Sequence, residues 1–258
     1  MLAPRIIPCL LVHDKGLVKT VKFKNSKYVG DPINAVKIFN EKEVDELIVL
    51  DIDATVEGKE PDYQMIENLA TECRMPFCYG GGIKTLEQAQ KIFGLGVEKV
   101  AISSAAIENP ELVRNMAKIV GNQSVVVVLD VKKRLLSDKY DVWINNGRKN
   151  TKKDPLELAK EFEKLGAGEI VINSIDNDGL MKSYDFKLID AVRKTVNVPM
   201  TVLGGAGSLD NIKKLISKYG IIGAAAGSLF VFKGIYRAVL INYPGKEEKE
   251  TLIEASYK

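Results

Sequence analysis

Short apolar segments alternate with amphipathic segments from one end of the chain to the other. Eight of the apolar segments are strand candidates, most of them rich in β-branched residues, namely residues 6–12, 47–52, 76–79, 97–102, 125–131, 169–173, 199–203 and 221–225. Nearly continuous apolar runs of this length are typical of parallel strands that are covered on both faces. Eight such strands, each followed by a helical segment, predict an α/β fold, a single closed (βα)8 TIM barrel.

The helical segments have recognisable start signals. Asp31-Pro32, Asn109-Pro110 and Asp154-Pro155 each place a capping side chain before a proline at the first helical position. Thr85 and Gln88 have the spacing of a capping box. We therefore expect helices to begin at these four points.

The chain also repeats itself at long range. Residues 46–53 align with 169–176 at an offset of 123, and residues 80–82 and 102–104 align with 204–206 and 226–228 at an offset of 124. A repeat of this length corresponds to half a barrel rather than to a solenoid unit. We therefore predict one domain over residues 1–258, built from half-barrels over about residues 1–123 and 124–245.

One stretch, residues 132–153, interrupts this pattern after the fifth strand. Residues 140–147 within it have the composition of a strand and a turn, which predicts an inserted hairpin. Because the loops that follow barrel strands lie on the active face, the hairpin is either a cover over the site or a surface decoration.

The composition is that of a globular protein, and the length of 258 residues agrees with one barrel of roughly 250 residues. The 37 Lys and Arg residues are interspersed among 34 Asp and Glu, so we expect no nucleic-acid partner. No apolar run reaches the roughly 20 residues of a membrane span, and the N-terminus lacks the flanks of a signal peptide. We therefore expect a cytoplasmic protein that does not associate with membranes.

Histidine and cysteine usage limits the possible chemistry. His13 is the sole histidine, so a multi-histidine metal site or a Ser-His-Asp triad has little to be built from. Cys9, Cys73 and Cys78 show neither a disulfide framework nor zinc spacing. The chain also lacks a nucleotide-binding P-loop. We expect no metal and no cofactor, and any ATP chemistry would belong to a partner.

Two pairs of loops at the strand ends have the character of phosphate cradles. Glycines let the backbone approach an anion, and N–H groups at a helix start point toward it. The first pair follows the third and fourth strands, and the second pair follows the seventh and eighth. Their candidate residues are Gly81, Gly82, Ser103, Ser104, Gly204, Gly205, Gly227 and Ser228. A single glycine turn is equally well an ordinary tight turn, but two cradles across the mouth suit a ligand with a phosphate at each end.

Carboxylates follow several strands between the two cradles. Asp130 ends the fifth strand, where its side chain can face the mouth as a catalytic group. Asp51 ends the second strand, and Asp178-Gly179 follows the sixth, as substrate-binding candidates. Helix capping or turn formation is the alternative for each aspartate. Lys19, in the long loop predicted after the first strand, could fold over an anionic substrate, or be an ordinary solvated lysine.

Charged residues also stand at the opposite ends of four strands. Arg5, Glu46, Lys99 and Glu169 begin the first, second, fourth and sixth strands. A lone charge there is usually a solvated rim residue, but four charges of balanced sign predict a ring of ion pairs at the barrel bottom. Such a ring, called the charged ring below, would act as a plug or a gate.

The ordered motifs of this chain resemble those of the cyclase subunit of imidazole glycerol phosphate synthase, the HisF family. The likeness runs from MLAPRII to about Gly234 and includes the motifs GDP, GGGI, ENP, GAGEI, SID and GGAG. Residues 246–258 show no match. The related isomerase that shares both phosphate cradles lacks this N-terminus and the barrel-bottom charges.

The resemblance implies a partner, a route and a reaction. A separate HisH-like glutaminase docks on the bottom face, and its ammonia enters past the charged ring and travels inside the barrel. At the mouth the ammonia attacks a bis-phosphorylated ribulosyl aminoimidazole carboxamide derivative. Two aspartates act as the acid–base pair and a loop lysine closes over the substrate. Asp130 and Lys19 match the second aspartate and the lysine.

The departure from the family lies on the first strand. Where the family reads CLDV, this chain reads CLLV over residues 9–12, so Leu11 replaces the first catalytic aspartate. Leucine cannot transfer a proton, and a general acid or base is worth a factor of roughly 10² to 10⁴. The internal repeat places Leu11 and Asp130 at corresponding strand ends. Four other matched positions also differ from the family: Ser103, Ser104, Asn173 and Leu180.

Three functional hypotheses follow. In the favoured one, the chain is a paralogue that keeps the glutaminase dock and ammonia route. It would serve, with a third ATP-dependent amidotransferase protein, to convert an acetamido group of a surface-glycan sugar into an acetamidino group, as catalyst or as ammonia conduit. In the second, it is a genuine cyclase of histidine biosynthesis that uses Asp130 with Asp14 or His13. In the third, it is a non-catalytic scaffold or a sensor of a phosphorylated ligand.

Overall fold

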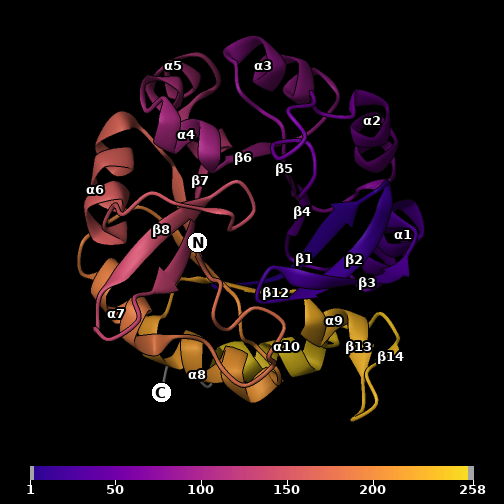
Figure 1. Ribbon diagram of the computed structural model, residues 1–258. Coiled ribbons are helices and arrows are strands. Elements are labelled where there is room, and N and C mark those ends of the chain that lie inside the picture. Colours follow the sequence, from indigo (N-terminus) through magenta and orange to yellow (C-terminus); the bar gives the residue numbers. More distant parts are fainter. Residues whose placement is uncertain (1–2, 255–258) are drawn as a thin grey trace.

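The predicted strands form a closed parallel barrel in the computed structural model, which describes residues 3–254. The barrel strands are β1 (Arg5–His13), β4 (Leu47–Asp51), β5 (Phe77–Gly80), β6 (Lys99–Ile102), β7 (Val125–Lys133), β10 (Glu169–Ser174), β11 (Met200–Leu203) and β12 (Gly223–Ala226). β1 pairs with β4 and β12, and β7 pairs with β6 and β10, so the sheet closes on itself. The fold is the predicted (βα)8 TIM barrel, with its helices on the outside (Figure 1).

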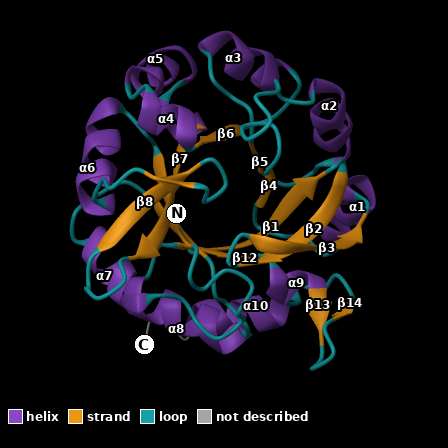
Figure 2. Ribbon diagram, in the orientation of Figure 1, coloured by secondary structure: helices purple, strands orange, loops and turns teal. Residues whose placement is uncertain are grey.

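Ten α-helices and a short 3-10 helix (Asn122–Ser124) are described within residues 3–254, and most of the α-helices surround the barrel (Figure 2). They are α1 (Pro32–Glu41), α2 (Tyr63–Glu72), α3 (Leu86–Gly94), α4 (Ser104–Glu108), α5 (Glu111–Val120), α6 (Pro155–Leu165), α7 (Phe186–Arg193), α8 (Leu209–Tyr219), α9 (Ser228–Val231) and α10 (Lys246–Glu254).

Three of the four predicted helix starts are confirmed. The Asp31 side chain caps α1, the Asp154 side chain caps α6, and Thr85 forms a capping box with Gln88 at α3. The prediction for Asn109 was wrong, because α5 begins at Glu111 without a side-chain cap. Asn109 contributes instead through its carbonyl oxygen, which accepts from Leu112 N at 3.1 Å.

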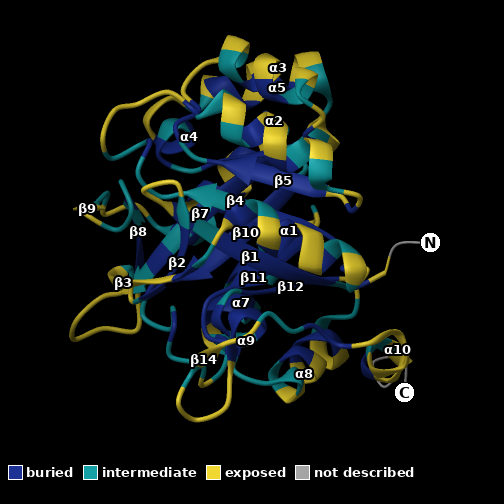
Figure 3. Ribbon diagram, turned by 90° about the vertical axis from the view of Figure 1, so that its right-hand side faces the viewer, coloured by how far each residue is buried: buried dark blue, intermediate teal, exposed yellow. Residues whose placement is uncertain are grey.

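Short antiparallel strands extend the barrel at one end. β2 (Gly16–Val21) and β3 (Lys24–Gly30) follow β1, and β8 (Tyr140–Ile144) and β9 (Lys149–Asn150) follow β7. A separate hairpin joins β13 (Phe232–Lys233) to β14 (Ala238–Val239). The hairpin predicted within residues 132–153 is therefore present, with β7 and β8 paired antiparallel. Figure 3 shows β3, β8 and β9 at the left of the molecule and α10 at the right.

The glycine loops correspond between the two halves at an offset of 123, not the 124 expected. Gly81 and Gly204 both have positive φ, 128° and 93°. A Cβ atom at Gly81 would lie 2.5 Å from Asp51 O, and one at Gly204 would lie 2.6 Å from Ser174 O. The two contacted carbonyls are themselves 123 residues apart, so each loop turns back over the preceding strand in the same way.

The barrel interior is mainly apolar between its two ends. The inward-facing core consists of Ile7, Cys9, Ile48, Cys78, Ala101, Val126, Val128, Val171, Leu203 and Ala225. The residues that begin the strands lie below this core, and those that end the strands lie above it. Any chemistry is therefore confined to the two ends of the barrel.

Candidate functional site

The mouth of the barrel is an open cavity at the C-terminal ends of the strands. All the predicted catalytic and substrate-binding residues line it: Lys19, Asp51, Gly81, Gly82, Ser103, Ser104, Asp130, Asp178, Gly179, Gly204, Gly205, Gly227 and Ser228. The tertiary structure thus gathers residues from eight separate loops and strand ends into one place. It does not by itself assign a role to any of them.

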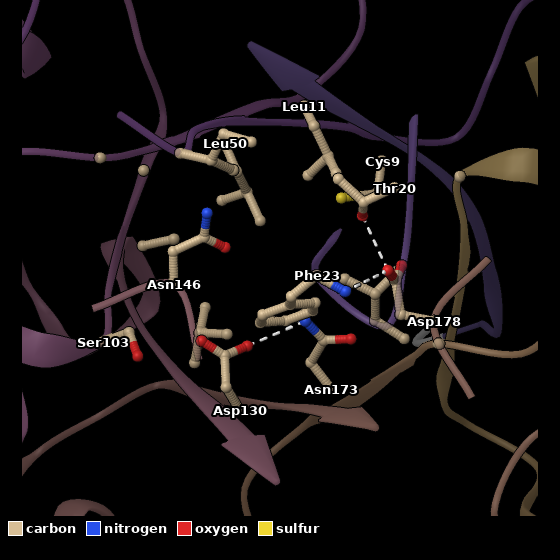
Figure 4. A pocket seen from close by; sticks show the side chains of 18 of the residues that line it. Cys9, Leu11, Thr20, Phe23, Leu50, Ser103, Asp130, Asn146, Asn173 and Asp178 are labelled. Atoms are coloured by element: carbon tan, nitrogen blue, oxygen red, sulfur yellow. Dashed lines mark hydrogen bonds between the residues drawn. The ribbon is translucent and has the colours of Figure 1, made fainter. Parts of the chain in front are cut away.

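Asp130 lies near the end of β7 and points into the mouth (Figure 4). Asn173 is its register partner on β10, and Asn173 Nδ2 donates a 2.8 Å hydrogen bond to Asp130 Oδ1. Burial raises the pKa of Asp130 to about 7, the Asn173 hydrogen bond opposes the rise, and the nearby Asp178 carboxylate adds to it. A carboxyl group with this pKa can accept and return a proton near neutral pH.

The opposite wall of the mouth is apolar. Leu11 on β1 is the register partner of Leu50 on β4, and both line the cavity. Figure 4 shows the two leucines across the cavity from Asp130 and Asn173. Leu50 precedes Asn173 by the repeat offset of 123, so the leucine pair corresponds to the Asp130–Asn173 pair of the second half. Among these four positions only Asp130 is ionisable.

Two buried polar atoms of the mouth have no hydrogen-bond partner among the described residues. They are Ser103 Oγ and Asn173 Oδ1. A buried polar atom without a partner costs about 1–3 kcal/mol. Because Ser103 and Asn173 both line the cavity, the two atoms are suited to bonding with a polar ligand.

Lys19 does not lie on a loop, contrary to expectation. The segment forms the β2–β3 hairpin, and Lys19 on β2 is only 5% exposed. Its Nζ donates a 2.6 Å hydrogen bond to Cys9 O and lies beside Gly227, where an added Cβ atom would come within 2.7 Å. Burial lowers the pKa of Lys19, and the Asp178 carboxylate opposes that effect. The lysine therefore already faces the second of the two predicted phosphate cradles.

The two hairpins meet over the mouth. Phe23, in the turn between β2 and β3, lies against Gly147, which follows β8. Asn146 lines the cavity, and Asn145 N donates a 3.0 Å hydrogen bond to Ser104 Oγ. The inserted hairpin is therefore part of the site wall. It donates a hydrogen bond to the hydroxyl oxygen of Ser104, one of the residues predicted to bind phosphate.

Two predicted binding carboxylates also anchor turns. Asp178 Oδ2 accepts hydrogen bonds from Thr20 Oγ1 at 2.7 Å and from Phe23 N at 3.0 Å. Asp51 Oδ1 accepts from two backbone N–H groups of the turn that follows it, at 2.9 and 3.0 Å. Burial raises the pKa of both carboxyl groups. Asp178 thus fastens the β2–β3 hairpin in place.

His13 and Asp14 lie outside the mouth cavity. Asp14 has a positive φ of 47° in the two-residue turn between β1 and β2. His13 Nδ1 is 2.7 Å from Asp53 Oδ1, and Asp14 N donates a 2.8 Å hydrogen bond to Asp53 Oδ2. The bond to Asp53 raises the pKa of His13. In this arrangement neither residue stands in for the aspartate that Leu11 replaces.

The charged ring forms at the other end of the barrel as the strand starts predict. Arg5 bonds to Glu46, and its Nη2 is 2.8 Å from Glu169 Oε1. Lys99 Nζ closes the ring at 2.8 Å from Glu46 Oε1 and 3.0 Å from Glu169 Oε2. Glu169 also accepts a hydrogen bond from Thr201 Oγ1.

Mutual attraction outweighs burial within the ring. Burial alone disfavours each charge, but the carboxylates raise the pKa values of Arg5 and Lys99 above their usual range. The two cations in turn hold the pKa of Glu169 below its usual value. Arg5, Lys99 and Glu169 therefore stay ionised, and all four groups are paired.

Within residues 3–254 no group of three or more His, Cys, Asp and Glu side chains is placed to hold a metal ion. Over the same residues, no helix has both the length and the apolar character needed to cross a membrane.

A family model described as "Histidine biosynthesis protein" matches residues 5–236. The chain therefore belongs to the HisF-like histidine biosynthesis proteins. A Leptospira interrogans relative, provisionally named imidazole glycerol phosphate synthase subunit HisF, is 61% identical over 252 residues, which cover 98% of this chain and 99% of the relative. A Vibrio vulnificus relative, provisionally named subunit hisF3, is 60% identical over 254 residues, 98% of each chain. Imidazole glycerol phosphate synthase subunit HisF of Clostridium botulinum strain 657 is 40% identical over 247 residues, 96% and 98% of the two chains.

Sequence reasoning missed part of the wall of this HisF-like site. Leu50, Phe23 and Asn146 line the cavity without having been predicted. The offset of 123 that pairs Leu50 with Asn173 was a usable signal for the first. Phe23 and Asn146 reach the mouth only because their hairpins fold back over it, which local patterns do not reveal.

Proposed function

We propose that this HisF-like barrel is the synthase subunit of a glutamine amidotransferase complex. A HisH-like glutaminase docks at the charged ring, and ammonia passes through the barrel to the mouth. The nitrogen is used to convert an acetamido group of a surface-glycan sugar into an acetamidino group in the cytoplasm. The barrel is either the catalyst or the ammonia conduit to a third, ATP-dependent protein, which activates the departing carbonyl oxygen.

One contrast supports this proposal. All four charged groups of the ring are paired, whereas the mouth carries Leu11 in the place of an acid–base aspartate. The residues proposed for ammonia entry are thus present, whereas one of the two aspartates of the family's cyclisation is absent. The names of the relatives favour a group of HisF paralogues: those at 54–61% identity have provisional names, two of them numbered hisF2 and hisF3, whereas those at 40% are named HisF without qualification.

The alternative is a genuine imidazole glycerol phosphate synthase cyclase of histidine biosynthesis with an atypical site. The observation in its favour is Asp130, whose pKa of about 7 suits a single group that acts first as base and then as acid. Both predicted phosphate cradles also line the mouth. This alternative has to work without His13 and Asp14, which lie outside the cavity.

The two proposals differ in an assay that needs no glutaminase. The purified chain is given a high ammonium concentration at alkaline pH together with the bis-phosphorylated substrate of the histidine pathway. We expect no turnover while circular dichroism shows an intact fold. Turnover near the rate of an ordinary cyclase would establish the alternative and overturn the favoured proposal.

The glutaminase dock is tested separately by charge reversal. We expect Lys99→Glu to weaken co-purification with a HisH-like glutaminase or to uncouple glutamine hydrolysis from ammonia delivery. Lys160→Glu, on the exposed face of α6, is the matched control. Unchanged binding and coupling in Lys99→Glu would show that the ring is not the ammonia entrance.

A further inference from the structure

The C-terminal segment packs at the ring end of the barrel. The chain leaves the β13–β14 hairpin, reaches Tyr243 and ends its described part in α10. In Figure 3, α10 lies at the end of the molecule opposite to β8 and β9. The match to the family model ends at residue 236, so this segment lies beyond it.

Two side chains of this segment form hydrogen bonds with residues next to the ring. Tyr243 OH donates a 2.8 Å hydrogen bond to Ile6 O and accepts a 3.3 Å bond from Asp45 N. Lys249 Nζ is 2.8 Å from Asp45 Oδ1 and 3.0 Å from Glu43 O. Asp45 Oδ2 in turn accepts a 2.8 Å bond from Ile6 N. Both backbone polar groups of Ile6 are therefore held.

Two of these bonded residues, Ile6 and Asp45, are neighbours in sequence of two ring residues. Ile6 follows Arg5, and Asp45 precedes Glu46. Arg5 and Glu46 bond directly to each other within the ring. A change in the position of Ile6 or Asp45 therefore shifts the backbone from which one of these two side chains projects. Tyr243 is itself well fixed, since it is 9% exposed and its ring lies 5.3 Å from that of Phe230.

We propose that Tyr243 and Lys249 are positioning residues that hold the Arg5–Glu46 side of the charged ring closed. The C-terminal segment thereby controls the passage of small molecules into the barrel from this end. The small molecule is ammonia, and this identification rests on the proposed function. The positioning role of Tyr243 and Lys249 does not depend on it. Because α10 flanks the face at which the glutaminase is proposed to dock, docking can act on the ring through Lys249.

The chain carries its own reporters of ring opening. Cys78 faces the barrel interior directly above the ring, as the register partner of Lys99. Cys9 faces the interior from the other end, where it lines the mouth cavity. Burial raises the pKa of both thiols, so labelling by methyl methanethiosulfonate is slow and depends on opening. A reagent that enters through the ring meets Cys78 first, and one that enters through the mouth meets Cys9 first.

The experiment measures, by mass spectrometry of the isolated full chain, the ratio of the Cys78 labelling rate to the Cys9 rate. We expect Tyr243→Phe and Lys249→Met to raise this ratio about tenfold, the effect of losing a hydrogen bond to a charged or buried group. Lys249→Arg should restore the original ratio. Glu250→Gln, on the exposed side of α10, should leave it unchanged.

Two results would overturn the positioning role of Tyr243 and Lys249. The first is an unchanged ratio in both variants. The second is a parallel rise of the two rates, which would mean that the segment supports the whole fold and not the ring. The labelling needs neither glutaminase nor acceptor, so it can succeed or fail independently of the ammonium and docking assays that test the proposed function.

Discussion

The two ends of the barrel satisfy their polar groups in opposite ways. At the ring, Arg5, Glu46, Lys99 and Glu169 are each bonded to partners of opposite charge. At the mouth, Ser103 Oγ and Asn173 Oδ1 are buried without a partner among the described residues. Buried polar groups are almost always paired in folded proteins, so the exceptions mark a place where a ligand can contribute. The charges of the ring are all paired within the protein, whereas the mouth has buried polar atoms that a ligand could bond.

The mouth itself is divided along the internal repeat. Asp130 and Asn173 form a hydrogen-bonded polar pair in one half, and Leu11 and Leu50 form an apolar pair at the corresponding positions of the other. The same backbone positions therefore carry a polar pair in one half and an apolar pair in the other. Substitutions at either end, or in either half, test how far these contrasts hold.

The largest effect is expected from charge reversal in the ring. Lys99→Glu puts a third carboxylate between Glu46 and Glu169, whose side chains are 3% and 6% exposed. Leaving buried charges unpaired typically costs about 3–5 kcal/mol of the free energy of unfolding. Urea denaturation measures this loss, with Lys160→Glu expected within about 0.5 kcal/mol of wild type. A loss below about 1 kcal/mol in Lys99→Glu would contradict the ring as a tightly coupled unit.

The next effect concerns the missing aspartate. Leu11→Asp restores an ionisable group opposite Asp130 and should give measurable ammonium-driven turnover of the bis-phosphorylated substrate where wild type shows none, because a general acid or base contributes a factor of roughly 10² or more. Leu11→Asn has nearly the same shape but transfers no proton, so it should show no gain. Equal rates in the two variants would mean that this position is not where the cyclisation was lost.

The third effect is a pH dependence of stability set by Asp130. Its pKa is about 7 in the folded chain and about 4 when unfolded, so the folded state holds an extra proton between these values. Stability is therefore lost as the pH rises from about 4 to above 7. Asp130→Asn removes this loss: the variant should match wild type near pH 4 and be more stable at pH 8, by up to about 1.4 kcal/mol for each unit by which folding raises the pKa. Denaturation at the two pH values provides the measurement, and a difference independent of pH would refute the raised pKa.

The smallest effect is expected within the polar pair. Asn173→Leu makes this half resemble the leucine half and removes the hydrogen bond that lowers the pKa of Asp130. That pKa should rise by about one unit, as followed by carbon NMR of the carboxyl group. Ser103→Ala, which removes the other unpaired polar atom, should leave it in place. An unchanged pKa in Asn173→Leu would show that the hydrogen bond does not contribute to it.

Features carried by short motifs at strand ends were predicted from the sequence. The barrel, the charged ring and both glycine–serine cradles depend on where each strand starts and stops, and hydrophobic periodicity reports those points. Lys19 was placed in a loop because its lysine-rich surroundings resemble solvated coil. β3 is exposed over most of its length and pairs only with β2, so it has no apolar run to reveal it. Tyr243 and Lys249 were missed because their partners lie about 200 residues away in the chain.

The sequence by itself determined the barrel, the two ends at which polar groups gather and the loss of an ionisable group at Leu11. These follow from periodicity and residue identity, which are local properties. Only the tertiary structure decided that His13 and Asp14 are turned away from the mouth and that Asp130 is paired with Asn173. Only the tertiary structure also decided that the C-terminal segment forms hydrogen bonds with Ile6 and Asp45 beside the ring. The reason is that strand register, turn geometry and burial set distances and pKa values, and each depends on residues far apart in the chain.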